Sequence, residues 1–135
     1  MLEVILVDDD PIVLLMQKRV VVRCGIHTSP LIFKSGSELF KYFEEQKIED
    51  DKSYLILLDI NMPGLSGWDV MDKFFNHPFK DNIHVIMVTS SIDLKDRNKA
   101  NTYDKIIGYI EKPVTLNNCY AIKNLEPINS YFSES

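Results

Sequence analysis

Cysteine and long apolar runs are both scarce in this sequence of 135 residues, which contains 2 Cys. Cys24 and Cys119 lie far apart and form no CxxC motif, so we expect reduced, partly buried thiols and neither a disulfide framework nor a zinc site. The longest apolar runs, 12–16 and 54–58, are much shorter than the roughly 18 residues that cross a bilayer. Acidic residues near the N-terminus also exclude a secretory signal. We therefore expect a cytoplasmic protein without a membrane-spanning segment.

Basic residues are in the minority, because 15 Lys and Arg stand against 20 Asp and Glu and give a formal net charge of -5. Proteins that bind nucleic acid through a basic surface need the opposite balance, so we expect no nucleic-acid partner. The remaining composition, 45% hydrophobic and 26% charged, is that of an ordinary globular domain. A chain of this length can bury a core of its own, and we expect one domain.

Short apolar segments alternate with longer segments of helical pattern along the chain. The predicted strands are residues 3–7, 31–33, 54–58, 84–88 and 106–110. The predicted helices are residues 11–25, 37–46, 68–75, 94–103 and 115–125, and the polar residues 47–53 are expected to form a solvated loop. Right-handed crossovers between these units predict a doubly wound α/β fold, an open five-stranded parallel sheet with helices on both faces.

Several predicted helices carry residues that favour a start or a stop. The predicted N-cap residues, which accept hydrogen bonds from the first N–H groups of a helix, are Asp10, Ser35 and Thr115. Glu38 stands three residues after Ser35 and predicts a capping box. Pro11 suits the first helical position, and Gly25 suits the end of the same helix.

Polar residues stand at the ends of four predicted strands, and in a parallel sheet these ends meet at one edge, where ligands bind. The residues are Asp8, Asp9, Asp59, Thr89 and Lys112. Three carboxylates at one point repel one another, so we expect a cation. Carboxylate oxygens without His or Cys favour Mg²⁺ or Mn²⁺ over zinc. Because Thr89 and Lys112 could bind phosphoryl oxygens, the set predicts phosphoryl transfer to a carboxylate.

Four short segments together resemble the signature of response regulator receiver domains of two-component signalling. These are Val-Asp-Asp-Asp at 7–10, Leu-Asp-Ile-Asn-Met-Pro-Gly at 58–64, Val-Thr-Ser at 88–90 and Glu-Lys-Pro at 111–113. The resemblance covers residues 1 to about 125 and implies the flavodoxin-like strand order 2-1-3-4-5. It also implies a phosphorylation-dependent signalling switch.

The family pattern assigns a role to each acidic residue at the predicted edge. It makes Asp59 the residue that a sensor histidine kinase or a phosphotransfer protein phosphorylates. Mg²⁺ would be bound by Asp9, Asp59 and the main-chain carbonyl of Asn61, with Asp8 acting on the metal largely through water.

The same pattern assigns the remaining site residues. Thr89, Ser90 and Lys112 would bind the phosphoryl oxygens. Tyr109 matches the aromatic residue that turns inward when Thr89 moves toward the phosphoryl group. The Lys112–Pro113 peptide bond is expected to be cis, which is otherwise a minority state for X-Pro. The chain departs from the family before strand five, where residues 101–105 replace a small Gly-Ala pair and add one residue.

Three other interpretations share some of these features. A haloacid-dehalogenase-like phosphatase would use Asp8 as its nucleophile, but it needs a further acidic pair after its lysine. A flavodoxin-like cofactor carrier would need a glycine- and hydroxyl-rich phosphate loop after strand one, where this chain has three aspartates. A degenerate receiver would act as a binding module only. Whether Asp8 or Asp59 becomes labelled distinguishes the phosphatase from the receiver.

We expect a stand-alone receiver domain in residues 1–125 with a short tail, 126–135, that has no Lys or Arg and no effector domain. Its chemistry would occur at its own Asp59, so it would not be an enzyme with a separate substrate. A downstream protein would bind the face formed by helix four, strand five and helix five. The chain would be a monomer or a phosphorylation-dependent dimer.

Overall fold

Five parallel strands form one sheet in the order β2-β1-β3-β4-β5, which confirms the predicted topology. The structure is a computed structural model, and it describes residues 1–46, 52–74, 76–78, 80–90 and 93–132. The strands are β1 (Leu2–Val7), β2 (Leu31–Phe33), β3 (Ser53–Asp59), β4 (Ile83–Thr89) and β5 (Ile106–Glu111). Most of the loop predicted at 47–53 lies outside the described residues, and Ser53 already belongs to β3.

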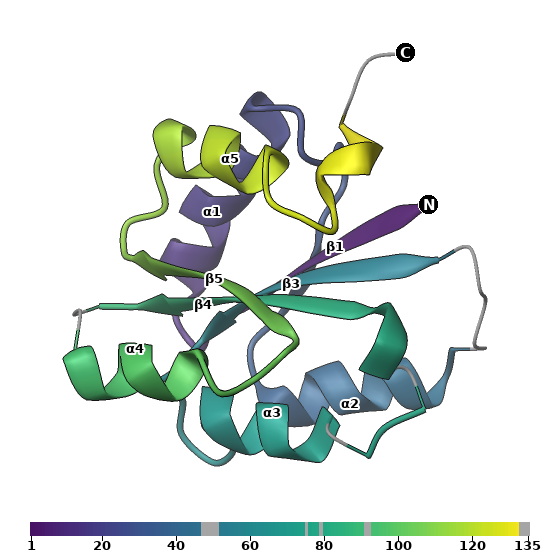
Figure 1. The fold of residues 1–135 in the computed structure, drawn as a ribbon, viewed down its shortest axis with the longest axis vertical. Coiled ribbons are helices and arrows are strands. Elements are labelled where there is room, and N and C mark those ends of the chain that lie inside the picture. Colours follow the sequence, from purple (N-terminus) through teal and green to yellow (C-terminus); the bar gives the residue numbers. More distant parts are fainter. Residues whose placement is uncertain (47–51, 75, 79, 91–92, 133–135) are drawn as a thin grey trace.

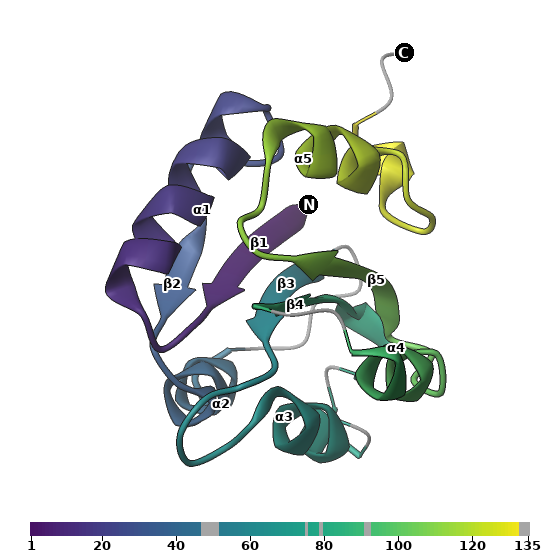
Figure 2. The same cartoon turned by 90° about the vertical axis from the view of Figure 1, so that its left-hand side faces the viewer.

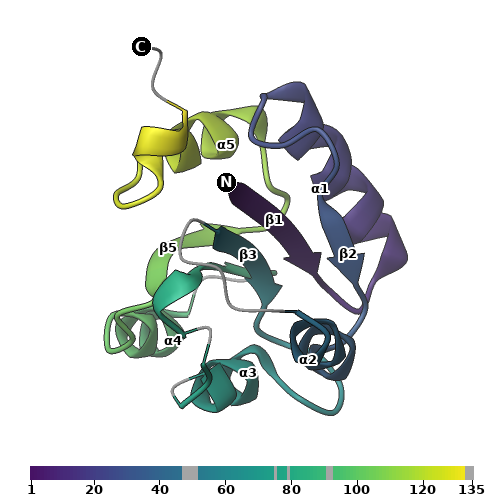
Figure 3. The ribbon, with the colours of Figure 1, turned by 90° about the vertical axis from the view of Figure 1, so that its right-hand side faces the viewer.

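Helices cover both faces of the sheet, as Figure 1 shows from one side. The helices are α1 (Pro11–Arg23), α2 (Gly36–Glu44), α3 (Gly67–Phe74), α4 (Leu94–Ala100) and α5 (Leu116–Lys123). Two of them, α1 and α5, lie on one face, and α2, α3 and α4 lie on the other, which is clearest in the side views of Figure 2 and Figure 3. Within the described residues, no helix combines the length and apolar character that crossing a bilayer requires.

The helix ends follow the predicted caps with two differences. Asp10 accepts from the N–H of Ile12, and Thr115 accepts from that of Asn118. Ser35 also caps its helix, but the Glu38 carboxylate accepts from Lys34 N at 2.6 Å and not from Ser35 N, so the predicted capping box is only half formed.

The second difference is the end of α4. The sequence predicted a helix through Tyr103, but α4 ends at Ala100 and its C-cap is Asn101. The Thr102 hydroxyl donates to the carbonyl of Lys99 at 2.7 Å, so it binds a terminal carbonyl of the helix. The chain then turns toward β5. The predicted end of the helix before it, Phe75, lies outside the described residues.

Two apolar cores lie on opposite faces of the sheet, because side chains alternate along each strand. On one face, the first core packs strand residues against α2 and α3; its fully buried members include Ile5, Ile56, Val85, Phe43 and Phe74. On the other face, the second core packs against α1 and α5; its members include Leu6, Leu57, Ile86, Leu14 and Ile122. β3 is buried on both faces, as a central parallel strand should be.

Strand β5 contains one extra residue. Ile106 pairs with Val85, but the next pair joins Gly108 with Ile86, so Ile107 has no partner of its own in β4. This irregularity is a bulge, and it shifts the alternation of side chains by one position. Ile106 and Tyr109 therefore both pack against the first core, whereas Ile107 and Ile110 pack against the second.

The C-terminal segment folds back onto the second core. Its short 3-10 helix η2 (Asn129–Tyr131) follows a cis Glu126–Pro127 bond, and Ile128 is fully buried. The Tyr131 hydroxyl lies 2.9 Å from Ser53 Oγ, at the start of β3. Ile128 and the partly buried Phe132 thus pack against the second core, and Tyr131 reaches the end of the sheet away from the carboxyl edge. A second 3-10 helix, η1 (Lys80–Asn82), precedes β4.

The connection from β3 to α3 depends on Gly67. Its N–H donates to the carbonyl of Ile60 at 2.8 Å. A Cβ atom on Gly67 would lie 2.7 Å from the carbonyl oxygen of Asp59 and 2.9 Å from Ile60 Cα. Both are backbone atoms that cannot rotate away. Helix α3 can approach the end of β3 only because residue 67 has no side chain.

We expect Gly67→Ala to lower the free energy of unfolding by about 3 kcal/mol, because the added methyl group overpacks against backbone. Gly64→Ala is the matched control: Gly64 has φ +78° but nothing within 4 Å of a Cβ, so only the backbone strain of about 1 kcal/mol should appear. Urea denaturation followed by circular dichroism measures both. Equal losses in the two variants would contradict the steric argument.

Candidate functional site

Four strands bring polar side chains to the carboxyl edge of the sheet, as the sequence predicted. Asp59 and Thr89 are the last residues of β3 and β4, Asp8 and Asp9 follow β1, and Lys112 follows β5. One carboxylate oxygen from each of Asp8, Asp9 and Asp59 lies within 4.8 Å of the others. Asp8, Asp59 and Thr89 are nearly inaccessible, at 1%, 3% and 1% exposure, whereas Asp9 is exposed.

Lys112 lies between the two buried carboxylates. Its Nζ is 2.7 Å from Asp8 Oδ2 and 3.3 Å from Asp59 Oδ1. The lysine is held in place from its backbone, because its N–H donates to the Thr89 carbonyl at 2.7 Å. The Lys112–Pro113 bond that follows is cis, as the resemblance implied. The predicted lysine and the predicted phosphoacceptor are therefore in direct contact.

Backbone N–H groups orient both buried carboxylates. Asp8 Oδ1 accepts from Asp10 N at 2.9 Å, and Asp59 Oδ1 accepts from Asn61 N at 3.3 Å. In each case the donor stands two residues after the aspartate, which is the spacing of an Asx turn. The sequence analysis did not identify these donors. Asp8 and Asp59 could have predicted these donors, since an aspartate at a strand end favours a hydrogen bond from the N–H two residues later.

The environment of Asp59 disfavours its charged form. Burial and then the charge of Asp8 raise the pKa of Asp59 from 3.8 to about 6, although Lys112 and the Asn61 N–H act in the opposite direction. For Lys112, burial opposes the charge, but the hydrogen bond to Asp8 and the nearby carboxylates outweigh it and raise the pKa. Lys112 is thus held in its charged form, whereas the charged form of the adjacent Asp59 is disfavoured by its surroundings.

Thr89 and Tyr109 lie next to each other at the edge of β4 and β5. The Tyr109 hydroxyl oxygen is buried, and burial, followed by the charges of Asp96 and Asp93, raises the pKa of Tyr109, while the Thr89 side chain lowers it. The Thr89 side chain is thus near enough to influence the Tyr109 hydroxyl, and the action of the two residues as a switch stays a prediction. Ser90, the other predicted phosphoryl ligand, is exposed immediately after Thr89.

The charges and donor atoms of the site suit a divalent cation. Three carboxylates and one ammonium leave a net charge of −2 within a small volume. Oxygen ligands with room for water are what Mg²⁺ and Mn²⁺ prefer. Asn61 is exposed at the rim with its N–H turned to Asp59, and its role as a carbonyl ligand stays a prediction.

We expect Asp59 to make the metal-free protein less stable as the pH rises. Its native pKa of about 6 exceeds its ordinary value of 3.8, so the folded protein holds this proton more tightly than the unfolded chain. The contribution of Asp59 to the free energy of unfolding is fully present below about pH 4, and it is lost as the pH rises through about 6.

Asp59→Asn should abolish this dependence. In the presence of a chelator, the free energy of unfolding of the variant relative to wild type should rise by about 2 to 3 kcal/mol between pH 4 and pH 7. Urea denaturation at several pH values measures it, and the difference between the two proteins cancels the other titrating groups. If this difference in unfolding free energy stays constant or falls between pH 4 and pH 7, the pKa of Asp59 is not raised in the folded protein.

Comparison with known proteins identifies the family. The response regulator receiver domain model matches residues 4–123. A two-component response regulator from Cytophaga hutchinsonii superposes with a TM-score of 0.80 at 29% identity, over 92% of this chain and 95% of that one. A response regulator receiver protein from Dyadobacter fermentans superposes with a TM-score of 0.82 at 23% identity, over 99% and 100% of the two chains, and at that identity it shows the fold alone.

The curated relatives match this chain over only part of their own length. The two-component response regulator-like PRR37 of Oryza sativa subsp. indica is 27% identical over 124 residues, which are 92% of this chain and 16% of that protein. The chain thus spans less than a fifth of the length of this relative. None of these similarities favours the phosphatase or the cofactor carrier. The chain belongs to the response regulator receiver domain family of two-component signalling.

Proposed function

We propose that the chain accepts a phosphoryl group on Asp59, in a Mg²⁺-dependent reaction, from a sensor histidine kinase or a phosphotransfer protein. The observation that carries this proposal is the position of the Lys112 ammonium, within 2.7 Å of Asp8 and 3.3 Å of Asp59. A charge placed beside the acceptor carboxylate can also neutralise an incoming phosphoryl oxygen. The reaction would take place in the cytoplasm.

The acidic group would hold the cation. Asp8, Asp9 and Asp59, with the main-chain carbonyl of Asn61, are the residues for Mg²⁺, and Mn²⁺ has the same ligand preference. When bound, the cation supplies positive charge that offsets the repulsion between carboxylates and phosphoryl oxygens. Asp59 must be deprotonated to act. Lys112 lowers the pKa of Asp59 and so favours this form, and a bound cation would act in the same direction.

The chain's own residues account for the transfer. Asp59 Oδ1 is engaged by Asn61 N and Lys112, so we assign the attack to Oδ2. A bond forms between this oxygen and phosphorus as the bond from phosphorus to the donor breaks, and the electron pair leaves with the donor. Lys112 and the hydroxyls of Thr89 and Ser90 would bind the transferred oxygens. Because the acceptor is part of the protein, we do not class the chain as an enzyme with a separate substrate.

Incubation with Mg²⁺ and acetyl phosphate should add one phosphoryl group to the wild-type chain. Asp59→Asn should take up none, because it lacks the attacking oxygen, and a chelator should abolish uptake in wild type. Lys112→Ala should slow uptake by about 100-fold or more, the usual effect of losing one charge-stabilising group. Intact-protein mass spectrometry under mild conditions measures each.

Peptide mapping of the labelled protein separates the alternatives. Label on Asp59 is expected of a receiver, whereas label on Asp8 would indicate the phosphatase chemistry. A wild-type chain that takes up no label under any of these conditions would be a receiver that acts by binding alone. Uptake that persists without metal would contradict the role given to the acidic group.

The output surface is proposed to be the face formed by α4, β5 and α5. Thr89 and Tyr109 connect the phosphorylation site to this face through their proximity. Leu94 on α4 and Tyr120 on α5 are large apolar side chains that are 71% and 51% exposed there, which suits a protein partner. Phosphorylation would change binding at this face to a downstream protein, or to a second copy of the chain. Light scattering before and after phosphorylation tells the two apart.

Phosphorylation should change the environment of Tyr109. With 3-fluorotyrosine incorporated at this position, we expect its ¹⁹F resonance to shift when acetyl phosphate and Mg²⁺ are added, because the nearby Thr89 would move toward the phosphoryl group. The same label at Tyr131 is the control, since that residue contacts Ser53 at the other end of the sheet and should not respond. An unchanged Tyr109 signal in fully phosphorylated protein would remove this residue from the switch.

A further inference from the structure

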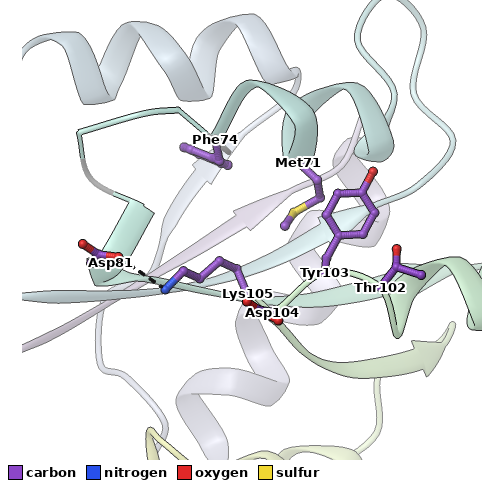
Figure 4. Close-up of a pocket in the computed structure, with 7 residues that line it drawn as sticks. All are labelled: Met71, Phe74, Asp81, Thr102, Tyr103, Asp104 and Lys105. Atoms are coloured by element: carbon purple, nitrogen blue, oxygen red, sulfur yellow. Dashed lines mark ion pairs between the residues drawn. The ribbon is translucent and has the colours of Figure 1, made fainter.

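A cavity of about 340 Å³ lies between α3 and the connection from α4 to β5 (Figure 4). Its lining residue Lys105 directly precedes β5, whereas Lys112 follows the other end of that strand. The residues that line the cavity are Met71, Phe74, Asp81, Thr102, Tyr103, Asp104 and Lys105. Four of these belong to the segment in which the chain departs from the family pattern, 101–105. A volume of this size is at the lower end of the range for small-molecule sites.

Tyr103 forms a fixed aromatic wall of the cavity. Its hydroxyl donates to Asp72 Oδ1 at 2.7 Å, and its ring stacks on Trp68 with centroids 5.8 Å apart. Burial and then the hydrogen bond to Asp72 raise the pKa of Tyr103 to about 12. Lys99 Nζ lies 4.9 Å from the centroid of the Trp68 ring on the same assembly. Contacts at both ends hold the ring in one position, so the wall exists before any ligand arrives.

The segment that carries Tyr103 is tied to the sheet. Val85 N donates to the carbonyl of Lys105 at 2.7 Å, and the β5 bulge follows at Ile107. The Thr102 hydroxyl is bonded to the end of α4. The departure from the family pattern is therefore an ordered structure with its own hydrogen bonds, and it builds one side of the cavity.

The floor of the cavity is apolar and its rim is acidic. Met71 and Phe74 are buried at 2% and 1% exposure. On the rim, Asp81 and Asp104 outnumber Lys105, whose Nζ lies 3.8 Å from Asp81 Oδ1 at an exposed position. The rim thus has a net negative charge. A ligand that matches both parts has an apolar body and one positive charge.

We propose that this cavity binds an amphipathic cation, a molecule with an aromatic ring and an ammonium group. The ring would contact Tyr103 and Met71, since aromatic faces and thioether sulfur are favourable partners for a ring. Because Asp81 already pairs with Lys105, the ammonium would lie at the rim beside Asp104. This site does not depend on phosphorylation of Asp59 and stands or falls separately from the proposed function.

The test uses the wild-type chain and 2-phenylethylammonium as the probe. Trp68 is the one tryptophan of the sequence and stacks on the cavity wall, so its fluorescence should change saturably, with half-saturation at about 1 mM for a ligand of this size. Two matched probes separate the parts of the proposal. The anion 3-phenylpropionate has the same ring and should bind at least 10-fold more weakly, and ethylammonium has no ring and should not saturate.

Two variants and a second signal locate the site. Asp104→Asn should weaken binding by about 2- to 5-fold, in the usual range for one exposed charge pair. Glu126→Gln removes one acidic charge on the other side of the sheet and should leave binding unchanged. The Met71 methyl resonance should shift with the same concentration dependence as the fluorescence. No saturation, equal binding of the anion, equal effects of the two variants, or an unmoved Met71 resonance would each overturn the proposal.

Discussion

The structure depends most on the ammonium group of Lys112, which separates two carboxylates that would otherwise be buried side by side. Parallel strands of similar length deliver Asp8 and Asp59 to the same point, so their repulsion is a direct consequence of the topology. Removing one partner of a buried ionic group typically costs about 3 to 5 kcal/mol. The apolar cores on both faces of the sheet supply the stability that allows this conflict to exist.

The same conflict between buried carboxylates supports the chemistry proposed for this edge. One ammonium does not neutralise three carboxylates, and burial, together with the charge of Asp8, raises the pKa of Asp59 to about 6. A divalent cation would bring the net charge of −2 to zero, and in the proposed reaction a phosphoryl group could then approach without net repulsion. The grouped carboxylates lower the stability of the fold but provide the residues of the proposed site. Such a trade-off between stability and function is common at functional sites.

Most of the fold could be predicted because local signals agreed with one another. Each strand is a short apolar run that ends at a polar residue, and caps such as Asp10 and Thr115 mark the helices. The site residues were predictable for a topological reason, since strand ends share one edge. The stack of Trp68 on Tyr103 and the burial of Ile128 were not predictable, because they join segments that are distant in the sequence. The predicted end of α4 at Tyr103 was wrong, because the tertiary contacts of Tyr103 outweighed the helical pattern of residues 101–103.

The bulge in β5 decides which helices lie next to Tyr109, and so which surface could respond to the proposed phosphorylation site. Without the extra residue, a strand would place side chains three positions apart on opposite faces, so Ile106 and Tyr109 would point to different layers of helices. The bulge puts both on the side of α3 and α4, and Gly108 leaves room for the displaced backbone against Ile86 and Leu125. A single inserted residue thus sets the direction in which a signal could leave this sheet.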